Sequence, residues 1–213
     1  MQRPASASLQ PRKKPSQARS TASVEAILDA TLQVLLAVGK ERLTTTRVAQ
    51  RAGVSVGTLY QYFPNKSSLL QACLKRHMGE VSRAVEEVCA VQRNGRLLAM
   101  GTSLVDAYLE AKLRNARASA ALYAVSSDVD GAAISREARA KSAHTVAAYF
   151  ATAQEGLTRP AAVVATMVLA AMHGTLQRVL EAKSPQAEAD VLRTELLTLL
   201  HGYLQACAAA PTD

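Results

Sequence analysis

The feature that most constrains this chain is a segment, residues 44–66, in which small, flexible and apolar residues stand at fixed separations. Ala49, Gly53 and Leu59 follow one another at intervals of four and six residues. Two short helices that cross steeply need a small residue where they meet, a turn residue free to adopt positive φ, and an apolar anchor on the second helix. The segment supplies all three, so it predicts a helix-turn-helix hairpin.

The rest of the chain has the same helical character. Apolar residues recur at spacings of three and four, and sustained alternation of β-branched residues is absent. The sequence therefore predicts an all-α fold in which a three-helix helix-turn-helix domain precedes a larger helical domain. The expected helices run from the cluster at residues 20–23 to Gly39, then over 45–52, 56–63, 66–88, 95–114, 117–127, 132–155, 159–182 and 186–208. We expect Asn65 to cap the fourth helix, and Pro185 to open the last one after Ser184.

Positive charge is confined to the first third of the chain. Residues 1–76 hold twelve Lys and Arg against three Asp and Glu, a net charge of +9, whereas residues 77–213 hold thirteen against fourteen, a net charge of −1. Such an asymmetry is typical of a nucleic-acid-binding module joined to a neutral one. Five of the twelve basic residues lie in the Pro-, Ser- and Gln-rich first twenty residues, which we expect to be a disordered basic tail, so charge alone also fits a solvated tail.

The outward face of the second hairpin helix is the candidate for major-groove contact. Small residues there let the backbone approach base edges, and hydroxyl groups can bind phosphate oxygens. The first hairpin helix can offer hydroxyls and N-terminal amides to another phosphate. Leu59 and Phe63 are expected in the core, and Tyr62 fits either packing or a phosphate contact. The candidate DNA-binding residues are Thr45, Thr46, Ser55, Val56, Gly57, Thr58, Tyr60, Gln61, Tyr62 and Lys66.

Residues 27–70 closely resemble the DNA-binding domain of the TetR/AcrR family of bacterial transcriptional regulators. The resemblance rests on Thr45, Val48-Ala49, Arg51-Ala52-Gly53-Val54-Ser55, Gly57-Thr58-Leu59-Tyr60, Tyr62-Phe63, Asn65-Lys66 and Leu69-Leu70. It implies a homodimer that binds an inverted-repeat operator in double-stranded DNA, usually as a repressor, and that a small molecule releases. The implied domains are a tail at 1–20, a helix-turn-helix domain at 21–66 with its motif at about 45–64, and a ligand-binding and dimerisation domain at 67–213.

The family's last two helices form its dimer interface, which here implies the segments 159–182 and 186–208. Both segments carry broad apolar faces, although these faces also fit an ordinary interior. The candidate interface residues are Met167, Ala171, Leu176, Val179, Leu196, Leu200 and Tyr203.

A ligand cavity is expected among the middle helices, 95–155, where aromatic and Met side chains make deformable apolar walls. The same residues also suit a packed core. The candidates are Tyr108, Tyr123, His144, Tyr149, Phe150, Met172 and His173.

Other function classes find little support in the sequence. The four histidines are dispersed, there is no Cys-x-x-Cys or Gly-rich phosphate loop, and three cysteines suit neither a disulfide framework nor a zinc site. We therefore expect no enzyme, no cofactor and no metal. No uninterrupted apolar run approaches the roughly 18–20 residues of a membrane span, and the N-terminus lacks the core of a secretory signal, so we expect a cytoplasmic bacterial protein without a membrane partner. The alternative function is a helical small-molecule-binding or scaffolding protein that binds nucleic acid non-specifically.

Overall fold

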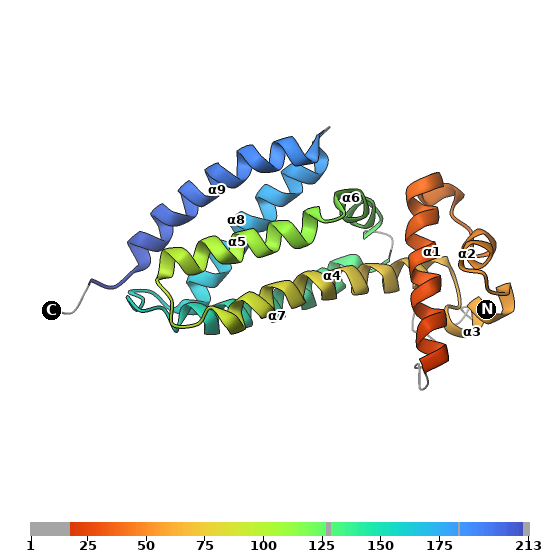
Figure 1. Cartoon of the computed structure of the whole chain (residues 1–213), viewed down its shortest axis with the longest axis horizontal. Helices are drawn as coiled ribbons and strands as arrows, with labels where there is room; N and C mark the ends of the chain where they lie inside the picture. The colour runs from red at the N-terminus through yellow and green to blue at the C-terminus, as the bar shows by residue number, and fades with distance from the viewer. Residues whose placement is uncertain (1–17, 127–128, 183, 211–213) are drawn as a thin grey trace, which may run out of the picture. The chain divides into compact units, whose positions relative to one another are not determined.

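A computed structural model describes residues 18–126, 129–182 and 184–210 of the chain. Its regular elements are α-helices, which confirms the predicted all-α class (Figure 1). The helices are α1 (Ala18–Arg42), α2 (Thr45–Ala52), α3 (Val56–Tyr62), α4 (Lys66–Val91), α5 (Leu97–Leu113), α6 (Ala116–Val125), α7 (Gly131–Phe150), α8 (Ala161–Glu181) and α9 (Pro185–Cys207). Residues 1–17, most of the predicted tail, lie outside the described residues.

The helix ends follow the capping signals of the sequence, with exceptions in α1, α7 and α9. Asn65 caps α4 as predicted, since its Oδ1 accepts a hydrogen bond from the Ser68 amide at 2.8 Å. Pro185 begins α9, although Ser184 makes no side-chain capping bond. Helix α1 begins earlier than predicted, at Ala18, and resumes for a few residues after Gly39, whose φ of 75° interrupts it. Helix α7 was predicted to continue to residue 155 and instead ends at Phe150, where the chain enters turns.

The chain divides into two compact units, and each unit is built from two separate stretches of the sequence. Among the described residues, the first unit contains 18–77 and 121–134, and the second contains 78–120 and 135–210. Helix α4 begins in the first unit and continues in the second. The end of α6 and residues 129–134 join the first unit, where the Gln71 side-chain amide donates to the Val129 carbonyl at 3.3 Å.

The first unit has its own apolar core. Helix α1 packs against α2, and α2 against α3. On α1, Arg76 of α4 forms ion pairs of 2.8 Å with both Glu25 and Asp29. The fully buried side chains of this unit include Ile27, Leu43, Val48, Leu59, Phe63 and Leu69.

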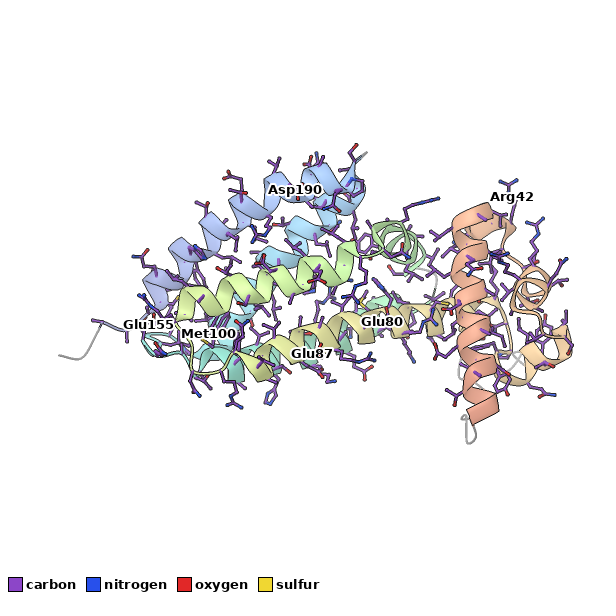
Figure 2. All side chains as sticks on the ribbon, viewed as in Figure 1. Arg42, Glu80, Glu87, Met100, Glu155 and Asp190 are labelled. Atoms are coloured by element: carbon purple, nitrogen blue, oxygen red, sulfur yellow. The ribbon has the colours of Figure 1, made fainter. Side chains whose placement is uncertain are left out.

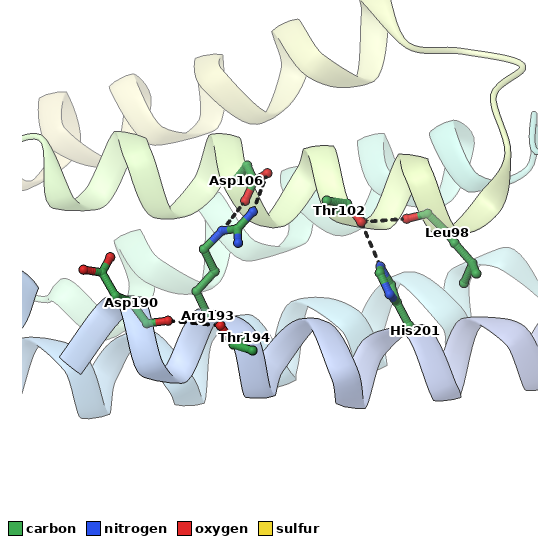
Figure 3. A network of polar contacts seen from close by, with 7 residues as sticks. All are labelled: Leu98, Thr102, Asp106, Asp190, Arg193, Thr194 and His201. Carbon is green, nitrogen blue, oxygen red and sulfur yellow. Dashed lines mark hydrogen bonds and ion pairs between the residues drawn. The ribbon is translucent and has the colours of Figure 1, made fainter. Parts of the chain in front are cut away.

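In the second unit α9 packs against both α5 and α8, and the three helices lie side by side in Figure 1. Polar pairs flank the apolar contact between α5 and α9 (Figure 3). The Arg193 guanidinium donates to both carboxylate oxygens of Asp106, at 2.7 and 3.0 Å. Thr102 gives its hydroxyl proton to the Leu98 carbonyl and lies 2.8 Å from His201 Nε2, which is therefore the donor of that pair. These bonds fix the register of α9 on α5.

The loop after α7 closes the far end of the same unit. Figure 2 shows Glu155 beside the beginning of α5 and close to Met100. The Glu155 carboxylate accepts a hydrogen bond from the Leu97 amide at 2.9 Å and lies 3.5 Å from the Arg96 guanidinium. The hydrogen bond from the Leu97 amide and the positive charge of Arg96 lower the pKa of Glu155. The carboxylate thus serves as the N-terminal cap that α5 itself lacks.

By length and composition alone, two helices could cross a membrane. They are Ser20–Arg42 and Ala161–Glu181, with mean hydropathies of 1.5 and 1.4 in the windows concerned. A third of the first window and 39% of the second are buried inside the protein. Core helices of water-soluble proteins meet the same criteria, so these two helices are weak grounds for a membrane location.

Replacing Gly53 by alanine should destabilise the first unit. The φ of Gly53 is 67°, and an L-residue in this left-handed conformation costs about 1–2 kcal/mol, even though an added Cβ would meet no atom within 4 Å. Urea unfolding should show this loss. Gly57→Ala is the matched control, because Gly57 lies in a helix and its added Cβ would meet only Ser55 Oγ at 3.7 Å. Equal stability of the two variants would contradict the role given to the turn.

Candidate nucleic-acid interface

The hairpin of α2 and α3 is set by its turn and by a capping residue before each helix. Gly53 donates its amide to the Gln50 carbonyl at 3.3 Å, and Val54 donates to the Ala49 carbonyl at 3.0 Å. Thr44 Oγ1 accepts from the Arg47 amide at 3.3 Å, and Ser55 Oγ accepts from the Thr58 amide at 2.9 Å. The turn therefore closes with the left-handed glycine, and each helix start has one amide satisfied by its capping side chain.

The burial pattern confirms the predicted orientation of α3. Ala49 and Leu59 are buried at 1% and 0% exposure, and Phe63 is buried beside the end of α3. On the other side, Val56 is 37% and Tyr60 42% exposed. Helix α3 thus anchors one face in the core and presents the face predicted for DNA to solvent.

A hydrogen bond joins the predicted contact residues of the two hairpin helices. Thr45 Oγ1 and the Tyr60 hydroxyl lie 3.1 Å apart, and either can be the donor. Thr45 opens α2, while Tyr60 lies on the exposed face of α3. The pair brings two hydroxyl groups and the first amides of α2 to one place on the surface, an arrangement that suits a phosphate oxygen.

Three further predicted contact residues also have hydrogen bonds within the protein. The Ser55 and Thr58 hydroxyls lie 2.8 Å from each other, and Ser55 is also the cap of α3. The Lys66 ammonium donates to the Lys40 carbonyl at 2.6 Å. These side chains therefore have structural roles besides any contact with DNA. Thr46, Gly57 and Gln61 are exposed, and Tyr62 is half-buried.

Two arginines of α2 belong with this surface although the motif alone did not single them out. Arg47 donates to the Arg42 carbonyl at 2.9 Å, and Arg51 donates to Gln33 Oε1 at 2.6 Å. Both side chains are exposed. Their separation of four residues places them on one face of α2, and that spacing was the signal in the sequence. Guanidinium groups held in this way suit phosphate contacts.

The second unit collects most, not all, of the predicted ligand-pocket residues in its interior. Tyr149 and Phe150 stack with ring centroids 5.6 Å apart, and the rings of Tyr108 and His173 lie 5.4 Å apart. Met172 is fully buried. Tyr123 and His144 are exposed, so the expectation that they line an interior cavity is wrong. Helical spacing places a residue on a face but does not say which face is covered.

On the same face of α5 as Tyr108 lies a buried lysine that the sequence did not mark. Lys112, one helical turn after Tyr108 on α5, is 7% exposed, and burial lowers its pKa to about 8. Its ammonium has the sulfur of Met78 as a contact, at 4.0 Å. The Tyr108 hydroxyl is buried without a hydrogen-bond partner, and burial raises its pKa. Lysine is rarely buried without a paired charge, so sequence periodicity gave no reason to expect it here.

Groups suited to metal or redox chemistry do not gather in the described ranges. No set of three or more His, Cys, Asp or Glu side chains there could hold a metal ion. Cys73, Cys89 and Cys207 are buried free thiols. Burial raises the pKa of Cys73 to about 12 and that of Cys89 to about 11, so neither is a ready thiolate at neutral pH.

The predicted dimer residues divide between the interior and the surface. Leu176, Val179, Leu196 and Leu200 are at most 4% exposed, and they fill the core of their own chain. Their assignment to a dimer interface is therefore wrong. Met167 is 52% exposed, and Ala171 and Tyr203 are half-buried. Val163 and Leu199, which are 49% and 60% exposed, add to the apolar surface of α8 and α9.

Two family models match this chain. Residues 27–73 match the model described as bacterial regulatory proteins, tetR family, and residues 97–204 match the model of the tetracyclin repressor-like C-terminal domain. The first match contains the hairpin, and the second spans half of the chain.

Curated relatives resemble the chain only around the hairpin. The transcriptional repressor KstR of Mycolicibacterium smegmatis is 47% identical over 55 residues, which are 26% of this chain and 27% of that protein. The fatty acid metabolism regulator protein of Bacillus subtilis is 36% identical over 61 residues, 29% of this chain and 31% of that protein. The match thus spans about a third or less of these relatives' length.

Solved structures extend the likeness to nearly the whole fold. A TetR-family transcriptional regulator from Streptomyces coelicolor aligns with a TM-score of 0.67 at 22% identity, covering 88% of this chain and 98% of that one. The fatty acid degradation regulator FadR of Bacillus halodurans aligns with a TM-score of 0.62 at 16% identity, covering 90% and 95%. At such identities the likeness establishes the fold.

Replacing Lys112 by methionine should stabilise the free protein. A pKa of about 8 instead of 10.5 means that the unfolded chain binds the proton more tightly, which costs the native state about 3 kcal/mol at pH 7. The cost falls as the pH rises from 8 to 10.5, so the difference between wild type and Lys112→Met should shrink over that range. Urea unfolding at several pH values measures it.

Arg114→Met is the control for the loss of a cation from the same helix end, because the Arg114 side chain is 75% exposed. It should change stability by less than about 0.5 kcal/mol. A Lys112→Met protein that is less stable than wild type at pH 7 would contradict the unpaired state of the ammonium.

Proposed function

This chain belongs to the tetR family of bacterial regulatory proteins, and on that premise we propose that it is a non-enzymatic transcriptional repressor in the bacterial cytoplasm. It binds an inverted-repeat operator as a homodimer and leaves the operator when a small molecule binds the second unit. The named relatives that share its hairpin include a transcriptional repressor and a metabolic regulator, which supports the proposal.

The exposed face of α3 is the observation that carries the proposal. Leu59 and Phe63 hold the helix by one side, and Val56, Gly57 and Tyr60 stand on the other. A short helix with this division can enter a major groove with its backbone close to base edges. Gly57 allows the closest approach, the Val56 methyl groups suit the methyl of thymine, and Tyr60 with Thr45 suits a phosphate.

Charge supports the same surface. The net charge of +9 over residues 1–76 attracts the phosphate backbone, and the exposed Arg47 and Arg51 lie on α2 of the hairpin. Such contacts supply affinity that falls with salt, while the groove face of α3 supplies sequence preference.

Dimerisation gives the two hairpins a fixed spacing. The apolar side chains Val163, Met167 and Leu199 are exposed on α8 and α9, which suits a contact between these helices and their copies in a second chain. Two recognition helices about 34–36 Å apart would then reach successive major grooves on one side of the duplex. Ligand binding in the second unit would alter that spacing and release the operator.

Tyr60→Phe should weaken operator binding by about three- to tenfold, the usual effect of losing one hydrogen bond, without destabilising the protein. The hydroxyl that it removes is paired with the Thr45 hydroxyl at the protein surface. The measurement is fluorescence anisotropy at fixed salt with a duplex selected by the purified protein from a random library. Tyr123→Phe is the matched control, because Tyr123 is an exposed tyrosine outside the hairpin.

Selection that yields no palindromic duplex, or an affinity for it within tenfold of random DNA, would refute specific recognition. It would instead indicate the scaffold with non-specific binding, because a specific repressor exceeds its own non-specific affinity by roughly 10³ or more.

Met167→Glu should convert the dimer to a monomer, because it places a charge on the exposed apolar face of α8. Light scattering after size exclusion measures the mass. Val91→Glu is the control, since Val91 is an 80% exposed valine at the end of α4, a different helix. An unchanged dimer in the Met167→Glu variant would show that the subunits meet elsewhere.

A further inference from the structure

The interior of the second unit contains polar groups that no neighbouring side chain satisfies. Lys112 is 7% and Tyr108 3% exposed, yet among the described residues the tyrosine hydroxyl has no hydrogen-bond partner, and the contact of the lysine ammonium there is a thioether sulfur at 4.0 Å. Buried hydroxyls and ammonium groups are costly when unpaired. The unpaired Tyr108 hydroxyl and Lys112 ammonium, one helical turn apart, therefore lower the stability of the free protein.

These groups lie on adjoining positions. Tyr108 and Lys112 are four residues apart on α5, so they share one face of that helix. Across from them on α8, the His173 ring lies 5.4 Å from the Tyr108 ring. Burial lowers the pKa of His173, and the positive charge of Lys112 lowers it further.

The histidine has one nitrogen available. His173 Nδ1 lies 2.6 Å from the Leu169 carbonyl, and because a carbonyl can only accept, Nδ1 carries the proton. In the neutral ring Nε2 is then unprotonated, and it becomes a donor when the ring is protonated. The positive charge of Arg139 on α7 also acts on Tyr108 and His173, but the Arg139 side chain is exposed to solvent and is not part of the buried group.

The surroundings of this group are apolar and contain no compensating carboxylate. In the part of the chain that the structure describes, Lys112 forms no ion pair with an acidic residue. The side chains on neighbouring turns of α5 and α8 are Val105, Leu109, Leu169 and Met172, all in the same apolar core cluster. A few polar groups set in an apolar interior are one feature of small-molecule sites.

We propose that Lys112, Tyr108 and His173 form the head-group site for an organic monocarboxylate with an apolar body. The carboxylate would take hydrogen bonds from the lysine ammonium and the tyrosine hydroxyl, and His173 would add a third when protonated. One buried ammonium balances one negative charge, which favours a carboxylate over a phosphate dianion. The proposal rests on the regulatory function proposed above, for which it names the ligand class.

The probe is decanoate, with decan-1-ol and decyltrimethylammonium as neutral and cationic counterparts of equal chain length. Decanoate should raise the melting temperature of the wild-type protein, and the two counterparts should not. Lys112→Met should weaken decanoate binding, measured by calorimetry, at least about tenfold, because a charge-assisted hydrogen bond is lost. The control Arg114→Met, which removes an exposed cation from the same helix, should bind decanoate like wild type.

Tyr108→Phe keeps the test valid if Lys112→Met fails to fold. It removes a single unpartnered hydroxyl, so the free protein should melt at the same or a higher temperature while decanoate affinity falls about three- to tenfold. Carbon-13 NMR of labelled lysine adds a direct signal, since bound decanoate should raise the pKa of Lys112 above its value of about 8 in the free protein.

Three results would overturn the proposal: no stabilisation of the wild type by decanoate, equal stabilisation by decan-1-ol, or unchanged affinity in both variants. Operator binding without any ligand separates this from the proposed function. If the wild type and Lys112→Met bind the selected duplex equally while decanoate has no effect, the carboxylate site is wrong and the DNA-binding function stands. If neither protein binds a specific duplex, the proposed function itself fails.

Discussion

The left-handed turn at Gly53 is the constraint on which the proposed DNA-binding surface depends. Helices α2 and α3 have eight and seven residues, and isolated helices of that length are marginal in water. They persist because the turn brings them together and because Leu59 is fully buried. The same geometry decides which side of α3 remains outside, so the exposed face follows from the packing of the opposite one.

The sequence predicted most of this first unit because local chemistry determines it. Glycine at the turn, a hydroxyl residue before each helix and Asn65 before α4 act within a few residues of themselves. The bonds of Ser55 and Thr58 were harder to foresee. By residue type their hydroxyls suit a phosphate equally well, and only the folded structure shows that they pair with each other.

Prediction was weaker for the second unit because helical spacing does not say what covers an apolar face. Leu176, Val179, Leu196 and Leu200 looked like an interface, yet α5 and its neighbours bury them within one chain. Lys112 is the opposite case, a charged residue that the sequence places at the surface and the fold buries. Its type predicts a solvated side chain, and only tertiary packing reveals it as a buried cation.

The two units differ in how completely their polar groups are satisfied. The edges of the second unit are closed by matched pairs such as Arg193 with Asp106, whereas its interior keeps the unpartnered Tyr108 hydroxyl and the Lys112 ammonium. Sequences that fold well usually avoid such conflicts, and those that remain tend to mark functional sites. The surface for DNA thus rests on satisfied local bonds, and the proposed ligand site on unsatisfied ones.

The most direct measurement of the central claim is a chemical-shift map of the labelled protein as the selected duplex is added. The account predicts that the amides of residues 45–47 and 55–61 and the methyl groups of Val56 shift most, while those of the buried Leu59 side chain change little. Shifts confined to α5, α8 and α9, with α3 unaffected, would contradict it.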